Sequence, residues 1–393
     1  MKKLKVIQIC GASSSLIIRD YEEDIFRGWY AQIGFQLKKH SPSLNVECWT
    51  PEREYAKEDI KIKNKVKFRI FPTDVSIRHG MEISLSMIRA LKEEIEKSQS
   101  NKTRLILHFH EYHTWQTYLI LLLIQKKENV KIFAQHHGGR NPLSNLLKYK
   151  RLFLFFPVIA IMQFFENLLF KKIDLFYVLS DEEKKYLKDK IKAKIIFQTM
   201  GIENYFFKEG NQKKAREVLG FKINKKYLLY IGRLKTTKGI KELLDSMNEI
   251  GDKNITLILI GEGSDFHKFK EYAKKQEISN VNFLGAIYGD KKLEYLDACD
   301  ALILPSHTEG APVVLMEAIA KNLPVIATNV GGIPKMIKNN REGIIIRPKS
   351  KEDIKKAVVN ILKWMGKDIR KYAYKYKWEN IIKDTLGDYY ELL

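Results

Sequence analysis

Cysteine is scarce in this chain of 393 residues: it has only three, and Cys10, Cys48 and Cys299 lie far apart. Their spacing fits neither a disulfide framework nor a metal-binding motif, which predicts a reducing compartment. The first residues, MKKLKVIQIC, contain an apolar run too short for the hydrophobic region of a signal peptide. We expect this run to form a first strand and the protein to be cytoplasmic.

Motifs and long hydrophobic runs that mark other classes are missing as well. There is no P-loop, which argues against a nucleotide triphosphatase, and LILIGEGSDF (257–266) lacks the last glycine of a dinucleotide-binding fingerprint. The apolar run 152–162 is shorter than the roughly 20 residues that a membrane-spanning helix needs. It lies within 147–172, which is basic at both ends. We expect this segment to contact an anionic membrane surface, or else to line an apolar acceptor channel or pack between domains.

The chain carries a large excess of positive charge, +22 at pH 7. Such an excess suits nucleic acid, an anionic membrane or small polyanions such as nucleotide diphosphates, and it also occurs on surfaces that only confer solubility. No module interleaves aromatic and basic residues, so we expect no nucleic-acid partner. We assign most of the charge to the solvated surface and part of it to a membrane or phosphate role.

The chain does contain a regular alternation of short apolar runs and helical patterns, which predicts βα units and parallel sheets. We expect strands over 4–10, 46–50, 68–72, 104–109, 130–135, 175–180, 194–199, 227–232, 255–261, 281–285, 301–305, 324–328 and 343–347. The polar stretch 201–220 separates two series of strands. This predicts an α/β protein of two doubly wound, Rossmann-like domains, 1–203 and 204–375. We also expect a C-terminal helix (about 376–393) that packs back on the first domain. Ligands bind such sheets beyond the carboxyl ends of the strands, and we expect these two edges to face each other across a cleft.

One strand–loop–helix segment of the second domain suits a phosphate group. In YIGRLKTTKGIKELL (230–244), Arg233 and Lys238 flank a loop that leads into a helix near Gly239. Two cations beside the free N–H groups of a helix N-terminus make a good diphosphate site. Farther along, Gly331 and Gly332 follow a predicted strand, where they either make a tight turn or let the backbone approach a ligand.

The segment SHTEGAPVVLMEA (306–318) has two glutamates with seven residues between them. Pro312 suits the first turn of a helix, so Glu309 falls on a loop after a strand and Glu317 about one and a half turns into the helix. A carboxylate at that depth among aliphatic side chains needs a polar partner. The residues alone leave two interpretations open, a capping glutamate beside a surface-facing one, or a functional pair.

These segments occur in a fixed order: GRLKTTKGIKELL, LILIGEG, NVNFLGAI, PSHTEGAPVVLMEAIAKNLPVIATNVGGIP and KWENIIKDTLGDYY. Together they resemble the large retaining glycosyltransferase family 4, also called glycosyl transferases group 1, whose GT-B fold has two Rossmann-like domains. The resemblance covers roughly residues 195–390 and is looser in the first half of the chain. Its most specific element is E-G-A-P-V-V-L-M-E with its flanking residues.

The resemblance implies a role for each motif residue. Glu317 would accept hydrogen bonds from the ribose of a nucleotide-sugar donor, and Glu309 would lie beside the donor sugar. Arg233 and Lys238 would neutralise the leaving diphosphate. No metal ion and no pyridoxal phosphate is then expected as a cofactor, which agrees with the lack of an Asp-x-Asp motif at a strand end. The other donor-binding residues that the resemblance implies are Gly232, Gly310, Ala311, Pro312 and Val313.

In the first domain, the family usually has two glycines before its first helix. The chain keeps Gly28 and has Arg27 in place of the other, where it could contribute to a phosphate site. IFAQHHGGR (132–140) matches the family's strand that ends in a histidine near the donor sugar. We take His137 for that histidine, with His136 as the alternative, and expect it to orient the transferred sugar. Arg140 nearby could help to bind phosphate.

A second group of histidines, in LILHFHEYHTWQ (105–116), admits three interpretations. His108 and His110 would project to the same side of a strand, as metal ligands do, but apart from Glu111 no carboxylate or cysteine completes such a site. The histidines could instead be structural, or contact the acceptor. We place His110 with the residues of the acceptor or phosphate side and expect no metal site.

We therefore predict a retaining hexosyltransferase that uses a UDP- or GDP-linked sugar. The charge and the segment 147–172 favour a lipid-linked or cell-envelope glycan as acceptor, with the protein peripheral at the inner face of the cell membrane. A sugar-nucleotide epimerase shares the fold and is the alternative enzyme, and a phosphorylase-like enzyme would need a lysine-bound pyridoxal phosphate. A basic nucleic-acid-binding protein is the alternative that is not an enzyme.

Overall fold

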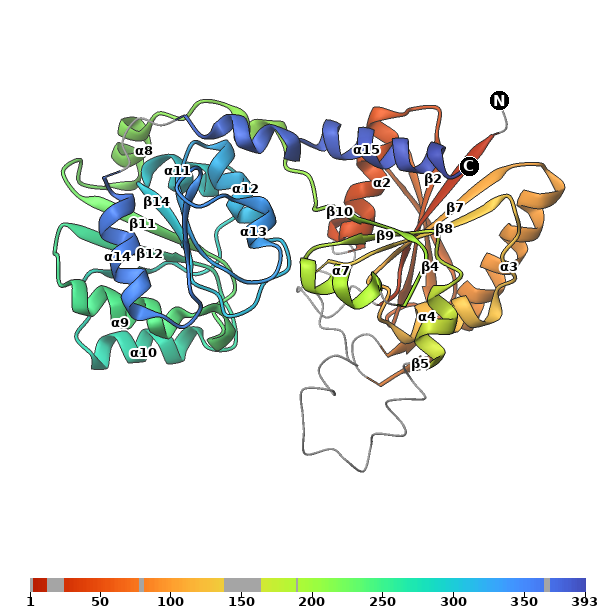
Figure 1. The fold of residues 1–393 in the computed structure, drawn as a ribbon, viewed down its shortest axis with the longest axis horizontal. Coiled ribbons are helices and arrows are strands. Elements are labelled where there is room, and N and C mark those ends of the chain that lie inside the picture. The colour runs from red at the N-terminus through yellow and green to blue at the C-terminus, as the bar shows by residue number, and fades with distance from the viewer. Residues whose placement is uncertain (1–2, 13–24, 78–80, 138–163, 189, 364–367) are drawn as a thin grey trace. The chain divides into compact units, whose positions relative to one another are not determined.

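The computed structural model of the protein describes residues 3–12, 25–77, 81–137, 164–188, 190–363 and 368–393. The chain divides into two compact units, Met1–Thr199 with Glu379–Leu393, and Met200–Trp378. Each unit contains one large sheet with helices on both faces (Figure 1).

The second unit is a doubly wound parallel sheet with the strand order β13-β12-β11-β14-β15-β16. The strands are β11 (Lys226–Ile231), β12 (Ile255–Ile260), β13 (Val281–Phe283), β14 (Ala301–Leu304), β15 (Val325–Thr328) and β16 (Gly343–Ile346). β11 and β14 are neighbours, with Leu228 opposite Ala301. The order of the strands reverses at this pair, and ligands bind at such switch points because the loops on either side diverge there.

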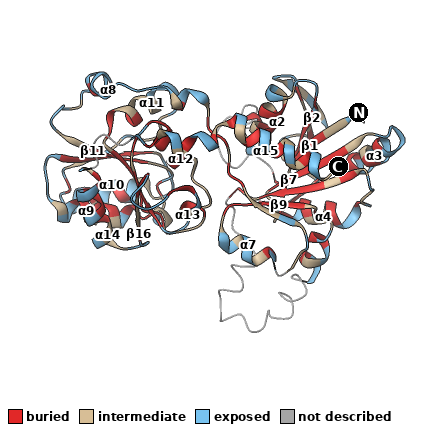
Figure 2. Cartoon of the chain, turned by 45° about the horizontal axis from the view of Figure 1, so that its top comes forward, coloured by how far each residue is buried: buried red, intermediate tan, exposed pale blue. Residues whose placement is uncertain are grey.

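Helices cover both faces of this sheet (Figure 1). On one face lie α9 (Ile240–Ile250), α10 (Phe266–Lys275) and α14 (Lys351–Ile361), and on the other lie α8 (Gln212–Leu219), α11 (Gly289–Ala298) and α12 (Val313–Ala320). Strands covered on both faces are apolar throughout, and every residue of β12 and β14 is buried. Figure 2 shows these buried strands between helices whose outer sides are exposed.

The first unit has an eight-stranded sheet in the order β10-β9-β8-β7-β1-β2-β4-β3. Its strands are β1 (Leu4–Cys10), β2 (Asn45–Glu52), β3 (Asp59–Lys63), β4 (Val66–Pro72), β7 (Arg104–His110), β8 (Val130–Gln135), β9 (Leu175–Val178) and β10 (Lys194–Phe197). All pair in parallel except β3, which is antiparallel to β4. β5 (Val75–Ser76) and β6 (Glu82–Ile83) form a separate short ribbon. The order reverses between β1 and β7.

The two faces of the first sheet differ in chemistry. Ile7, Ile9, Leu107 and Phe109 pack into an apolar cluster with α3 (Leu85–Ser100), α4 (Trp115–Leu123) and α7 (Asp181–Lys188). Side chains alternate along a strand, so Gln8, His108 and His110 point to the other face. There His108 and Gln8 meet α15 (Trp378–Glu391), whose residues from Glu379 onward belong to this unit. α2 (Trp29–His40) packs on β1, β2 and β4.

Every strand predicted from the sequence overlaps an observed strand, and the α/β prediction with two doubly wound sheets is confirmed. Pro312 lies at the N-cap of α12, so that helix begins at Val313. Of the apolar segment 147–172, the structure describes 164–172, in which 164–170 are helical. Within the described parts of the chain, no helix has both the length and the hydrophobicity that a membrane crossing needs.

Candidate active site

The loop after β11 carries the two predicted cations and lies against the loop after β14. Arg233 is exposed, and Lys238 ends a short 3-10 turn, η3 (Thr236–Lys238). Gly239, between η3 and α9, has a left-handed φ of 67°, and a Cβ there would stand 2.0 Å from the carbonyl oxygen of Pro305. The backbone N–H of His307 donates to the carbonyl of Thr237 at 2.9 Å. Glycine therefore allows these two loops to meet at the switch point.

Lys238 and Glu309 come together in this arrangement. The Lys238 ammonium donates to Glu309 Oε1 at 2.6 Å, and the hydroxyl of Ser306 donates to the same oxygen at 2.6 Å. Only 10% of the Glu309 side chain is exposed. A lysine ammonium has three N–H donors, so Lys238 keeps donors for a further anion.

The loop after β15 supports the turn that holds Glu309. Gly331 has φ of 55°, and a Cβ there would lie 1.9 Å from the carbonyl oxygen of Glu309. Gly332 donates its N–H to the carbonyl of Gly310 at 2.7 Å, and the Thr328 hydroxyl donates to the carbonyl of Ser306 at 2.6 Å. The close approach of the two backbones therefore explains why glycines occupy positions 331 and 332. Ala311, Pro312 and Val313 complete the turn and are partly exposed.

Glu317 is buried in α12 with a protein partner. Its Oε2 accepts a hydrogen bond of 2.5 Å from the ammonium of Lys292, which comes from α11. Lys292 also lies over the ring of Phe206, 5.5 Å from its centroid. From the resemblance we expected the ribose of a ligand to be the polar partner of this carboxylate. Because Lys292 is already a polar partner, the burial of Glu317 does not by itself require a ligand.

The Gly-x-Gly of 257–266 also has a structural role. Gly261 has φ of 135°, and a Cβ on it would lie 1.9 Å from the carbonyl oxygen of Gly232. A Cβ on Gly263 would lie 2.4 Å from the carbonyl oxygen of Leu234. The Gly232 N–H donates to the carbonyl of Ile260 at 3.0 Å. These glycines let the loop after β12 support the loop that carries Arg233.

In the first unit, His110 and His137 lie together at the carboxyl ends of β7 and β8. His110 Nδ1 is 2.7 Å from His137 Nε2, and His110 Nε2 is 2.6 Å from Gln8 Oε1. The ring of His108 stacks on that of His110 with centroids 4.6 Å apart. Burial holds the pKa of His110 and of His137 well below the usual value, so both rings are neutral at pH 7.

His136, the alternative to His137, has different surroundings. Its Nδ1 lies 3.1 Å from a carboxylate oxygen of Glu183, and its Nε2 lies 3.9 Å from Glu111. Glu111 also accepts the backbone N–H of His137 at 3.2 Å. His136 thus sits between two carboxylates, whereas the imidazole of His137 contacts His110 and the edge of Trp29.

The other predicted residues of the first unit are less well placed. Gly28 is the N-cap of α2, and Arg27 beside it is exposed. Arg140 lies outside the described residues, as does the Ser-rich loop before α2 from residue 13 on. In the part of the chain that the structure describes, no three His, Cys, Asp or Glu side chains are arranged to hold a metal ion.

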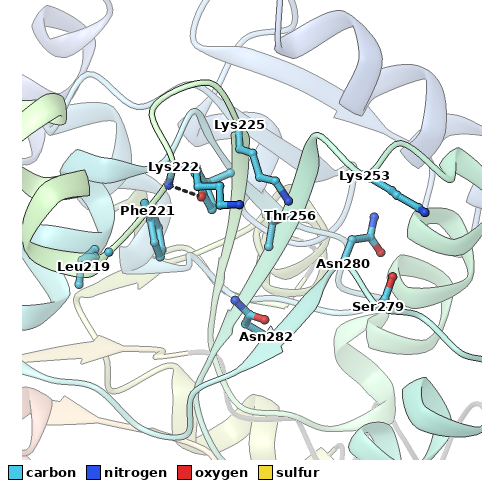
Figure 3. Close-up of a pocket in the computed structure, with 11 residues that line it drawn as sticks. Leu219, Phe221, Lys222, Lys225, Lys253, Thr256, Ser279, Asn280 and Asn282 are labelled. Carbon is cyan, nitrogen blue, oxygen red and sulfur yellow. Dashed lines mark hydrogen bonds between the residues drawn. The ribbon is translucent and has the colours of Figure 1, made fainter.

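A cavity of about 450 Å³ in the second unit lies away from these residues (Figure 3). It is lined by Tyr227, Thr256 and Asn282, which lie in β11, β12 and β13 on the side where β11 and β12 begin, and by Lys222, Lys225 and Lys253. Arg233 and Glu309 follow the opposite ends of their strands. The cavity therefore belongs to the other edge of the sheet, and its lining includes no carboxylate and no histidine.

The side chains that pair with the motif residues were not predicted from the sequence. They are Lys292 and Ser306 in the second unit and Gln8 and Tyr389 in the first. Ser306 could have been predicted, because it directly follows the predicted strand 301–305 and lies in the segment with the two glutamates. Lys292 stands in the lysine pair of α11 and carries no motif of its own.

Residues 211–376 match the family Glycosyl transferases group 1. An uncharacterized glycosyltransferase of Methanocaldococcus jannaschii is 31% identical over 183 residues, which are 44% of this chain and 47% of that protein. The chain spans about half the length of the curated relatives it matches.

Solved structures resemble the whole chain. Sucrose-phosphate synthase from Thermosynechococcus elongatus has a TM-score of 0.72 at 18% identity, covering 100% of this chain and 99% of that one. The HepE protein of Anabaena in complex with UDP has a TM-score of 0.66 at 14% identity, covering 100% of both chains. Residues 211–376 therefore resemble the glycosyl transferases group 1 family, and the chain has the GT-B fold.

Proposed function

We propose that the protein transfers a hexose from a nucleoside-diphosphate sugar to an acceptor hydroxyl and retains the anomeric configuration. The observation that carries this proposal is the convergence of Arg233, Lys238 and Glu309 on the loops after β11 and β14, at the switch point of the second sheet. Cations at that position suit a diphosphate, since its charge grows as the bond to the sugar breaks.

The two cations would divide this task. Arg233 is exposed and forms no ion pair with a described residue, so its planar guanidinium can bind two phosphate oxygens at once. The ion pair with Glu309 holds the ammonium of Lys238 in place, so its remaining N–H donors also have fixed positions. The charge on the leaving group is then stabilised without reorganisation of the site during the reaction.

Glu317 would bind the ribose of the donor. Its Oε2 is taken by Lys292, whereas its Oε1 has no hydrogen bond to a described residue and can accept one from a hydroxyl. UDP and GDP are the donors we propose, and UDP comes first because a protein of the same fold binds it.

Nucleotide binding tests this proposal. UDP or GDP at about 100 times its Kd should stabilise the second unit by ~2.7 kcal/mol and raise Tm by several degrees. Glu317→Gln should keep the Tm of the free protein within a few degrees and lose most of the nucleotide-induced rise. Glu271→Gln, at an exposed position of α10, is the matched control. If UDP, GDP and ADP all leave Tm unchanged, the proposal is wrong.

We further propose a lipid-linked or cell-envelope glycan as acceptor, with His137 orienting the transferred sugar and the protein peripheral at an anionic membrane. Exposed apolar side chains support the membrane contact: Phe164, Phe165 and Leu168 are 66%, 48% and 48% exposed. This helical stretch lies beside α4, because the Tyr118 hydroxyl donates to Glu166 at 3.1 Å. The neighbouring Leu122, on α4, is 53% exposed.

Lys172, at the basic C-terminal end of the segment 147–172, has another role in the structure. Its ammonium donates to the carbonyls of Leu121 and Ile124 at 2.5 and 3.0 Å, where α4 ends. A lysine there satisfies carbonyls that have no partner within the helix. Lys171 is exposed and can contact lipid headgroups.

A vesicle experiment tests the membrane contact. Vesicles with 30% phosphatidylglycerol should sediment the protein, and Phe165→Glu with Leu168→Glu should reduce the bound fraction several-fold, because a charge resists burial in the interface. Val218→Glu, at an exposed apolar position of α8, should bind like the native protein. Equal sedimentation of all three proteins would contradict the contact.

A further inference from the structure

A chain of hydrogen bonds joins the C-terminal helix to His137 through the interior of the first unit. The Tyr389 hydroxyl of α15 lies 2.6 Å from His108 Nδ1 and 3.2 Å from Gln8 Nε2. Gln8 Oε1 lies 2.6 Å from His110 Nε2, and His110 Nδ1 lies 2.7 Å from His137 Nε2. All five side chains are buried, and the four contacts link them end to end from His108 to His137.

The rings in this chain are neutral, so each has one N–H. Burial lowers the pKa of His108 to about 3 and that of His110 and His137 well below the usual value. A neutral imidazole donates from one nitrogen and accepts at the other. The proton position on one ring therefore fixes the proton position on the next.

The orientation of Gln8 decides the direction of the whole chain. When its oxygen faces His110, His110 must donate from Nε2 and accept at Nδ1, so that His137 carries its proton on Nε2. The hydroxyl of Tyr389 then accepts from Gln8 and donates to His108 Nδ1. This leaves the proton of His108 on Nε2, which is buried and has no hydrogen-bond partner among the described residues.

The opposite orientation leaves no fully buried ring N–H without a partner among the described residues. The two ends of a carboxamide have nearly the same shape, so Gln8 can turn and donate to His110 Nε2. His110 then donates from Nδ1 to His137 Nε2, and His137 carries its proton on Nδ1. Tyr389 donates to Gln8 and accepts from His108 Nδ1. Among the fully buried ring nitrogens, only the bare Nε2 of His108 is then unused. The other arrangement has a buried N–H without an acceptor, which is rare in native proteins.

We propose that Gln8, His110 and Tyr389 are positioning residues that place the proton of His137 on Nδ1. This nitrogen has no hydrogen bond to a described residue and is the one that a ligand can reach. His137 then presents a hydrogen-bond donor, which suits an oxygen lone pair of a sugar, and it does not act as the base that takes a proton from the acceptor. Only this last consequence rests on the proposed function.

Nitrogen NMR of the protein labelled with ¹⁵N-histidine tests the proposal without any nucleotide. In the native protein at pH 7, His137 should show a protonated Nδ1 and a bare Nε2. Tyr389→Phe removes the hydroxyl that holds Gln8 in one orientation, so the Nδ1 signal should move toward the range of a bare nitrogen. Gln8→Glu offers only oxygen acceptors to His110 Nε2, which should turn the hydrogen bonds round and have the same effect. Tyr390→Phe, on the exposed side of the same helix, should leave the spectrum of His137 unchanged.

A bare Nδ1 in the native protein would overturn the proposal. So would a His137 spectrum that neither Tyr389→Phe nor Gln8→Glu alters, since a purely structural histidine does not respond to a change of hydrogen-bond direction. Because the measurement needs no sugar or nucleotide, its result is independent of the nucleotide experiment on Glu317.

Discussion

Single glycines decide how closely the loops of the donor site approach one another. Gly331 and Gly289 have similar left-handed φ values, 55° and 61°, but different surroundings. A Cβ on Gly331 would lie 1.9 Å from the carbonyl oxygen of Glu309, whereas a Cβ on Gly289 would meet no atom within 4 Å. The two positions therefore separate the effect of φ from the effect of crowding.

We predict that Gly331→Ala destabilises the second unit more than Gly289→Ala. A left-handed alanine costs about 1–2 kcal/mol at either position. At Gly331 the backbone of Glu309 must also move, which adds a further loss of roughly 1–3 kcal/mol. Urea unfolding of both variants measures the difference. Equal free energies of unfolding would show that the Glu309 turn is not held by this contact.

The partners of the motif residues mark the limit of what the sequence could predict about the site. Lys238 and Glu309 were named from motifs, and the fold places their loops after neighbouring strands, so their meeting follows from topology. Lys292 was not named, because it reaches Glu317 from a helix that the sequence shows only as an exposed pattern. A contact between two helix faces depends on their packing, which local spacing does not determine.

Among the secondary-structure elements, strands covered on both faces were predictable and the edge strand was not. Continuous apolar runs such as β12 and β14 are buried on both sides. In β3, by contrast, Ile60 and Ile62 are 52% and 76% exposed, and the strand pairs with β4 alone. Asn64 and Lys65 both have positive φ in the hairpin turn, which is the geometry of a type I′ turn. A strand can be predicted from a sequence when at least one of its faces is buried and therefore apolar. β3 has no buried face.

Helix α15 accounts for polar residues that the sequence left unexplained. Gln8, His108 and His110 lie on buried positions of central strands, where apolar residues are expected. Their partner, Tyr389, is separated from His108 by 281 residues. The side-chain alternation of β7 predicted that His108 and His110 share a face, but only the docked helix shows which groups they meet.

Acid should act differently on the two units of the whole molecule. Burial lowers the pKa of four histidines of the first unit, His108, His110, His113 and His137, below the usual 6.5. Below pH 6.5 the unfolded chain binds protons at these positions and the native unit does not, so native stability falls as the pH falls. Glu166, whose pKa burial raises, has the opposite effect, but it is one group against four.

We predict that the first unit loses stability steeply between pH 6.5 and pH 4. Each of these histidines contributes a loss of up to about 1.4 kcal/mol per pH unit, so four contribute up to ~5.6 kcal/mol per unit. Hydrogen exchange at pH 7 and pH 5, corrected for intrinsic rates, should show protection lost in β1 and β7 while β11 and β14 stay protected. His108→Phe removes one of these protons and should make the loss less steep. Equal loss of protection in both sheets would contradict this origin of acid sensitivity.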